Sequence, residues 1–180
     1  WIYQFGFLSN FAWPFFVHDL PLSLAKELDV IANRHLKKWA GLHRSADLGT
    51  LYRSRERFGL GLTAPSTHFK KMGVVKSMLL KHSADPNVRY IYRDREKRES
   101  KFKTVWRASK LTNTVENSAT FSSRFKGQTN LNGLGHNRYN NDLSVTELRK
   151  LSSQAVSSLT DEQLWSHSHT LEMQGLDQVV

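Results

Sequence analysis

Residues 23–40, which read SLAKELDVIANRHLKKWA, decide the fold. Large side chains recur in this stretch every three or four residues, which places them on one face of an α-helix; they are Leu24, Leu28, Ile31, His35 and Trp39. Three basic residues fall together on another face, namely Arg34, Lys37 and Lys38. The sequence therefore predicts an amphipathic helix that ends at Gly41, with the Leu24–Trp39 face in the core and His35 as a packed core histidine.

The segment before this helix, residues 1–16, is almost uncharged and rich in aromatic residues. Its apolar positions wrap around a helix, so we expect a helix that is buried on most sides and is broken by Asp19 and Pro21. One small core cannot cover all of these side chains. Because the chain opens on Trp1 within an apolar run, the sequence predicts a fragment whose upstream partner packs on this helix. The run is shorter than the ~20 residues that a membrane span needs, so no transmembrane helix is expected.

After the first two predicted helices, glycine and proline residues interrupt the helical pattern. Gly59 and Gly61 would each weaken a helix by about 1 kcal/mol relative to alanine, so residues 48–62 are predicted to form a short helix or turn and then an extended stretch. A helical period returns over residues 67–82, with Ser66 as the expected N-cap. Pro86 suits the first turn of a further helix, which we expect to run to about Arg107.

The remaining third of the chain is less regular. Residues 110–142 are dominated by Asn, Ser, Thr and Gly, a composition typical of flexible linkers. Two short helical patterns follow, and Thr160 is expected to cap the second. The predicted fold is mostly α: a basic helical bundle over residues 1–107 with a short glycine-containing turn or strand, a flexible polar linker over 108–143, and a short helical tail over 144–180.

The charge of the chain is strongly uneven. The formal net charge is +10, and residues 26–110 carry 21 basic and 8 acidic side chains, whereas residues 111–180 carry 5 and 7. A basic block of this kind favours a polyanionic partner. The chain has no cysteine, which excludes disulfides and cysteine-based zinc sites and makes an intracellular location, cytoplasmic or nuclear, the expectation.

No constellation of catalytic residues is visible. Gly59-x-Gly61 lacks the remaining residues of a phosphate-binding loop and is interpreted as a turn. Asp94 and Glu96 stand two residues apart among basic residues, so salt bridges explain them better than two-metal catalysis. His167-x-His169 has no third ligand at a recognisable spacing. The sequence therefore predicts a chain that is not itself an enzyme and has no metal or cofactor.

Binding is better supported by the basic residues. Arginines and lysines near aromatic side chains suit a nucleic acid that is held by phosphate contacts and base stacking. Tyr52 and Phe58 flank the central group of arginines. The candidate nucleic-acid-binding residues are Arg34, Lys37, Lys38, Arg53, Arg55, Arg57, Lys70 and Lys71.

Three short stretches carry a resemblance to a known family. They are RHLKKWAGL at residues 34–42 and LYRS at 51–54, the latter followed by FGLGL at 58–62. They resemble the region just after the palm of non-LTR retrotransposon reverse transcriptases, over residues 11–75 and more loosely to Trp106. The resemblance implies a thumb that packs along the template–primer duplex, with Arg34, Lys37 and Lys38 on the nucleic-acid backbone. It also implies that Trp1–Phe16 packs against an upstream palm and fingers.

The chain departs from this family in one respect that bears on activity. The catalytic aspartates of the palm stand in an Asp-Asp pair, and no such dipeptide occurs here. Two alternatives stay open: a free-standing basic helical protein that binds RNA, and a non-catalytic scaffold that binds protein partners. An adjoining palm in the upstream reading frame would favour the thumb, and a start codon close to Trp1 would favour the others.

Overall fold

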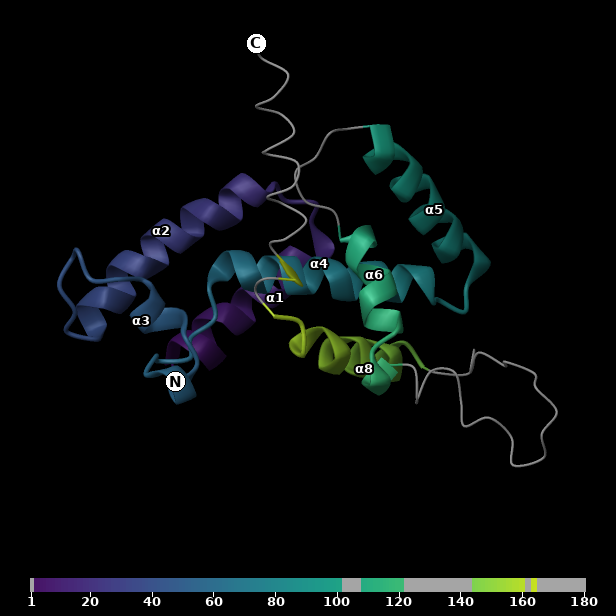
Figure 1. Cartoon of the computed structure of the whole chain (residues 1–180). Helices are drawn as coiled ribbons and strands as arrows, with labels where there is room; N and C mark the ends of the chain where they lie inside the picture. Colours follow the sequence, from purple (N-terminus) through teal and green to yellow (C-terminus); the bar gives the residue numbers. More distant parts are fainter. Residues whose placement is uncertain (1, 102–107, 122–143, 161–162, 165–180) are drawn as a thin grey trace, which may run out of the picture. The chain divides into compact units, whose positions relative to one another are not determined.

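The computed structural model describes residues 2–101, 108–121, 144–160 and 163–164 (Figure 1). These residues are mostly helical, and none of them lies in a β-strand, which confirms the predicted mostly-α fold. Two compact units are present, residues 1–72 and residues 73–180. The boundary lies inside a helix at Met72, earlier than the expected end of the first domain at residue 107.

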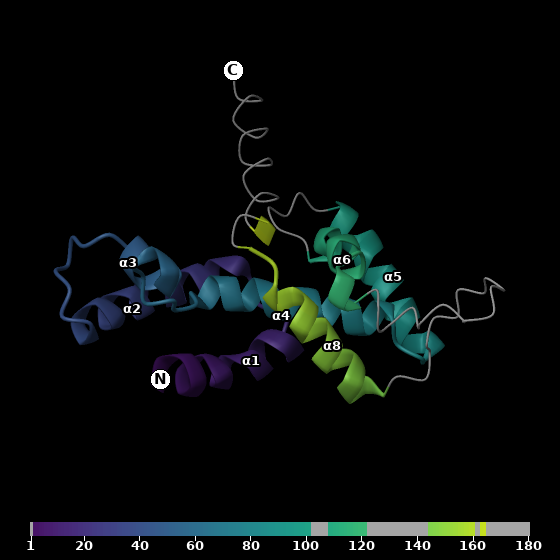
Figure 2. The same ribbon diagram turned by 60° about the horizontal axis from the view of Figure 1, so that its bottom comes forward.

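The first unit is built from two long helical segments and a short third helix. A single-turn π-helix, η1 (Ile2–Phe7), continues directly into α1 (Leu8–Val17). Helix α2 spans Leu22–Trp39, and the short α3 spans Gly49–Tyr52. A 3₁₀ turn, η2 (Arg55–Arg57), and the first part of α4 (Pro65–Lys81) complete the unit. In Figures 1 and 2, α3 lies beside the C-terminal half of α2.

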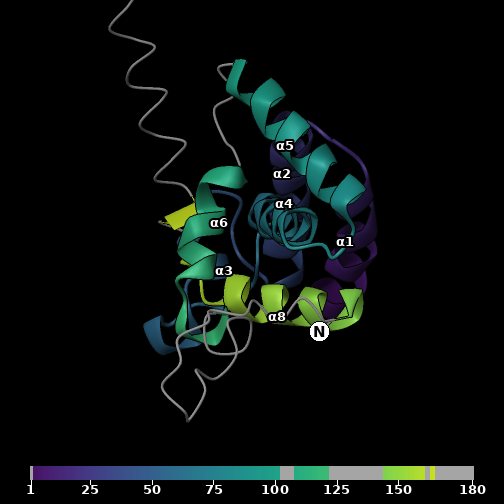
Figure 3. The ribbon, with the colours of Figure 1, turned by 90° about the vertical axis from the view of Figure 1, so that its right-hand side faces the viewer.

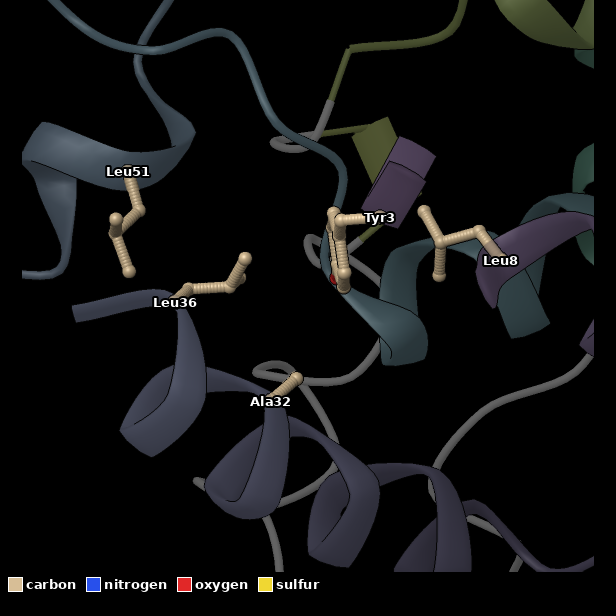
Figure 4. Packing of buried hydrophobic residues seen from close by; sticks show 5 residues of the cluster. All are labelled: Tyr3, Leu8, Ala32, Leu36 and Leu51. Carbon is tan, nitrogen blue, oxygen red and sulfur yellow. The ribbon is translucent and has the colours of Figure 1, made fainter. Parts of the chain in front are cut away.

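The core of the first unit joins residues that are far apart in the sequence. Figure 4 shows five buried side chains that meet there: Tyr3, Leu8, Ala32, Leu36 and Leu51. Burying an aliphatic or aromatic side chain stabilises a fold by about 1.5–3 kcal/mol. The Tyr3 hydroxyl also donates to the Thr63 carbonyl oxygen at 2.8 Å. The N-terminal helix therefore has a partner within its own unit.

The N-terminal helix nevertheless leaves part of its apolar surface uncovered. Leu8 and Phe15 are 3% exposed, whereas Ile2, Phe5 and Trp13 are 84%, 61% and 62% exposed. Phe15 packs edge-on against Phe69 of α4, with ring centroids 5.2 Å apart. The expectation that one core cannot cover all of these side chains is confirmed.

The buried face of α2 is not the predicted one. The helix buries Ala25, Ala32 and Leu36, and alanine at two of these positions lets neighbouring backbone approach closely. On the expected core face, Leu24, Ile31 and Trp39 are 37%, 54% and 67% exposed, and His35 is exposed as well. The prediction of this face, and of His35 as a core histidine, is wrong because hydrophobicity alone cannot tell which of two apolar stripes meets the core.

Helix α4 begins two residues earlier than expected, and the acceptor at its start comes from another helix. Pro65 is its first residue and has no backbone N–H to satisfy. The N–H of Ser66 donates to Asp29 Oδ1 on α2 at 2.8 Å. Ser66 is therefore inside the helix, and its prediction as the N-cap is wrong. Asp29 supplies the acceptor that an N-cap side chain ordinarily provides.

The second unit contains the rest of α4, α5 (Pro86–Lys101), α6 (Ser109–Glu116) and α8 (Val145–Ser157). The expected start of α5 at Pro86 is confirmed, whereas residues 102–107, its expected continuation, lie outside the described residues. Helix α6 lies where we expected a linker, and it buries Leu111, Thr112 and Val115. That part of the linker prediction is wrong, because three buried side chains at helical spacing outweigh a polar composition. Residues 122–143 lie outside the described residues.

Helices α6 and α8 pack against each other (Figure 3). Ser144 and Glu147 form a capping box at the start of α8, and the helix buries Leu148, Leu151 and Ala155. Thr160 Oγ1 accepts the Gln163 N–H at 3.2 Å, which confirms the predicted cap. The side chains of Lys81 and His82 both contact Glu116 Oε1, at 2.6 and 2.8 Å.

Candidate nucleic-acid interface

The basic end of α2 stops in a Schellman motif. The Leu42 N–H donates to the Lys37 carbonyl at 2.8 Å, and the Gly41 N–H donates to the Lys38 carbonyl at 3.2 Å. Gly41 has a φ of 65°, in the left-handed region where only glycine is free of strain. The predicted end of the helix at Gly41 is therefore confirmed.

The three basic residues of α2 do not share one environment. Arg34 and Lys38 are exposed, whereas Lys37 is half-buried and its Nζ donates to the Arg44 carbonyl oxygen at 2.9 Å. Lys37 thus fastens the loop that follows α2. Arg34 and Lys38 are the members of this group whose charges face solvent.

Helix α3 is fixed to α2 by packing and one hydrogen bond. Leu51 is fully buried in the core that includes Leu36. The Tyr52 hydroxyl donates to Asn33 Oδ1 on α2. Burial, followed by the charge of Asp29, raises the pKa of Tyr52 to about 12, so this hydroxyl keeps its proton at neutral pH. Tyr52 is therefore held against α2, and the arginine-rich segment begins at the next residue, Arg53.

The arginine-rich segment forms a second Schellman motif. After η2, the Gly59 N–H donates to the Ser54 carbonyl at 3.0 Å, and the Phe58 N–H donates to the Arg55 carbonyl at 3.1 Å. Phe58 occupies the position that Gly41 fills in the first motif, and its φ is 58°. Its side chain is 97% exposed. We call residues 53–59 the arginine turn.

Glycine is required immediately after Phe58. A Cβ on Gly59 would lie 2.0 Å from the Arg53 carbonyl oxygen, a distance that no side chain can adopt. The next residues pass beside α3, where the Leu60 N–H donates to the Thr50 carbonyl oxygen and the Leu62 N–H donates to the Leu51 carbonyl oxygen, at 2.9 and 3.0 Å. The predicted short helix and turn are confirmed by α3 and η2, whereas Gly61 has a φ of 64° and interrupts the expected extended stretch.

The arginine turn presents more positive than negative charge to solvent. Arg53, Arg55 and Arg57 are exposed, as is Glu56 between them. Arg53 also lies 3.4 Å from Asp47, and such an exposed pair contributes only about 0–1 kcal/mol to stability. The exposed guanidinium groups of Arg55 and Arg57 can therefore contact an anion in solution. Arg53 can do so as well, because the loss of its ion pair with Asp47 costs little stability.

Lys70 is not part of the candidate interface. Its side chain is 0% exposed, so its prediction as a phosphate contact is wrong. The physical reason is its position on α4, where Ser66, Lys70 and Val74 follow each other at four-residue spacing and are all buried. Burial raises the pKa of the Asp29 carboxyl, and the hydrogen bonds from Ser66 followed by the charges of Lys26 and Lys70 oppose that rise. Lys71 is half-buried.

Two features of this surface were not predicted from sequence. Arg44, in the loop that Lys37 holds, is exposed and adds a further cation a few residues after Lys38 in the sequence. Phe58 was expected only as an aromatic neighbour of the arginines, and its left-handed backbone was not foreseen. No signal in the sequence points to it, because a bulky residue is rare at a positive φ.

Within the ranges that the structure describes, no three His, Asp or Glu side chains gather as they would around a metal ion. His167 and His169 lie outside those ranges. Asp94 and Glu96 lie on α5, with Asp94 half-buried and Glu96 exposed. None of the helices in those ranges combines the length and the apolar character that a membrane crossing requires.

No family profile, curated protein or solved structure that was compared with this chain matches it.

Proposed function

We propose that the chain is a non-catalytic nucleic-acid-binding segment that holds a template–primer duplex by its backbone, as the thumb of a reverse-transcriptase polyprotein does. One observation carries the proposal. Two groups of exposed cations, Arg34 with Lys38 and the arginines of residues 53–57, stand on α2 and on a turn that the Tyr52–Asn33 hydrogen bond ties to α2. Cations on rigid supports contact phosphates without a large loss of side-chain freedom.

The composition of the two groups supports backbone contacts over base reading. Arginine forms bidentate hydrogen bonds with phosphate oxygens, and contacts of this kind fix the position of a protein on a duplex without reading its sequence. The proposal includes the upstream palm and fingers as the partner of Trp1–Phe16, for which the exposed Ile2, Phe5 and Trp13 are available. It also includes an intracellular location, in the cytoplasm or nucleus, where such a duplex is found.

Binding of blunt-ended duplexes of unrelated sequence, followed by fluorescence anisotropy over a range of salt concentrations, tests the proposal. A logarithmic plot of affinity against salt concentration should be steep, because each phosphate contact adds about 0.9 to its slope on B-form DNA. Replacing Arg34, Lys38 and Arg57 by alanine should weaken all duplexes about equally and flatten the slope. A slope near zero for the unmodified chain contradicts the proposal.

A matched variant separates this surface from net charge. Lys110, Arg149 and Lys150 are also exposed, on α6 and α8, and their replacement by alanine removes the same three charges. The proposal expects this variant to bind nearly as the unmodified chain does. Equal losses in both variants would mean that only the net charge matters, and would remove the argument for a thumb.

A further inference from the structure

We infer that Phe58 is a stacking platform for an unpaired nucleobase, next to the phosphate contacts of the arginine turn. The inference rests on the proposed function and adds to it the part of the ligand that this turn takes: a single-stranded stretch that continues from the duplex. Phe58 is 97% exposed. A phenylalanine in this state contributes nothing to the core of its own unit, so its fold gives no reason for its size.

The backbone conformation at Phe58 is unfavourable for any residue with a side chain. A φ of 58° is rare for any residue with a Cβ and is a true outlier for a bulky one. The chain itself offers the comparison, because the same motif at the end of α2 has glycine at the equivalent position, Gly41, with a φ of 65°. An aromatic side chain at a position that favours glycine, with no burial in return, points to a role outside the folded chain.

The turn holds the ring in a fixed place. The bonds from Phe58 to Arg55 and from Gly59 to Ser54 close the turn, and the Gly61 N–H donates to the Arg53 carbonyl at 2.9 Å. Gly59 lies so close to Arg53 that no side chain fits between them. Only the side-chain torsions of Phe58 stay free, so a base that stacks on the ring immobilises very little.

The surroundings of the ring match the chemistry of a single strand. Proteins that bind single strands without sequence preference combine aromatic platforms with cations along the phosphate backbone. Arg55 and Arg57 precede Phe58 directly in the turn, and both are exposed. Every base has a π-face, so one exposed ring accepts any of them. Glu56 is the only acidic residue of the turn, and it opposes the phosphates.

The test compares two probes that differ only in a single-stranded extension: a blunt duplex, and the same duplex with an unpaired overhang. The unmodified chain should bind the overhang probe more tightly. Phe58→Leu keeps an apolar side chain but removes the ring, and it should lose about 5- to 150-fold on the overhang probe, the range measured for base–aromatic stacking. Its affinity for the blunt duplex should stay within about twofold. Phe58→Trp should retain the advantage of the overhang.

Three controls make the outcomes decisive. Trp13→Leu removes another exposed aromatic side chain and should leave both probes unaffected. An overhang of abasic sites has the phosphates without the bases, so on it Phe58→Leu should match the unmodified chain. Phe58→Gly should bind the overhang as weakly as Phe58→Leu while melting no lower than the unmodified chain, because glycine relieves the strained φ.

The results also separate this inference from the proposed function. If Phe58→Leu binds the overhang probe as the unmodified chain does, while both bind the duplex with a steep salt dependence, the stacking role is overturned and the duplex-binding proposal stands. If the unmodified chain binds neither probe, both are overturned. An equal loss for Phe58→Leu on the base-containing and abasic overhangs also overturns the stacking role, because the ring would then contact something other than a base.

Discussion

At the scale of single residues, His68 combines burial with an incomplete set of hydrogen bonds. It lies on α4, and its ring centroid is 6.1 Å from that of Phe15. Its Nε2 atom is buried and has no hydrogen-bond partner in the part of the chain that the structure describes. Burial, and after it the charge of Lys71, lowers the pKa of His68 below its ordinary value of 6.5. The neutral imidazole is therefore the form that the folded unit favours.

This lowered pKa predicts loss of stability on mild acidification. Below pH 6.5 the unfolded chain takes up a proton at His68 more readily than the folded chain does, so the free energy of unfolding falls as the pH falls from 6.5 to the lowered pKa. One histidine contributes a slope of at most about 1.4 kcal/mol per pH unit. Urea unfolding between pH 7.5 and 5.5 should show this slope, and His68→Met should reduce it.

A second histidine contributes to the same pH dependence. His82 of the second unit also has a lowered pKa, caused first by burial and opposed by its bond to Glu116, so part of the slope should persist in His68→Met. If His68→Met had the same pH dependence as the unmodified chain, the assignment of the slope to His68 would be wrong.

At the scale of elements, the start of α4 depends on a side chain from α2. Asp29 accepts the Ser66 N–H at 2.8 Å, and its charge also interacts with Lys26 and the buried Lys70. Asp29→Ala and Asp29→Asn both remove the charge, but only asparagine keeps an oxygen acceptor. Urea unfolding should therefore find Asp29→Asn more stable than Asp29→Ala by about 1 kcal/mol, the usual value of a helix-capping bond.

The difference between these two variants is informative because the charge cancels out of it. Both variants remove a carboxylate whose charged form burial disfavours, as its raised pKa indicates, so the bond is measured between the two variants and not against the unmodified chain. Equal stabilities for the alanine and asparagine variants would show that the bond to Ser66 contributes nothing to the start of the helix.

The elements also show what sequence can and cannot predict in this chain. Local signals in the sequence predicted three helix boundaries. Gly41 ends α2, Pro86 starts α5, and Thr160 caps the helical turn that follows it. These signals work because capping bonds join residues close together in the sequence. The helix after Ser144 is equally visible in the sequence, because the spacing of Leu148, Leu151 and Ala155 is local as well, although Val145 at its start is exposed.

Decisions that depend on distant residues could not be made from sequence. Helix α2 has two apolar stripes, and the one with Ala32 is buried because it meets residues such as Tyr3 and Leu51. The same limit applies to the candidate interface. Arg34 and Lys38 were identified correctly as exposed cations, but the burial of Lys70 follows from contacts around α4 that its own sequence does not reveal.

At the scale of the whole molecule, charge and exposed apolar surface coincide in the first unit. It contains the candidate interface, the outward side of the N-terminal helix and the outward stripe of α2. The last two expose Ile2, Phe5, Trp13, Ile31 and Trp39. Isolated exposed apolar residues are common, but large exposed patches mark interaction sites. The proposed palm contact at residues 1–16 accounts for the first group, because it would remove these side chains from water.

The exposed side of the N-terminal helix predicts that the chain self-associates when no partner is present. Phe5 and Trp13 are 61% and 62% exposed, and pairing such side chains between copies removes apolar surface from water at about 25 cal/mol per Å². Analytical ultracentrifugation should show mass that rises with concentration, and a hydrophobic dye should bind. Phe5→Glu with Trp13→Glu should suppress both effects and leave the melting temperature nearly unchanged, since neither side chain is in the core.

Tyr90→Glu with Ile91→Glu, which alters two exposed residues of α5 and adds the same charge, should suppress neither. A chain that stays monomeric and binds no dye at the highest soluble concentration would show that this surface needs no partner, and would weaken the case for a palm packed against it.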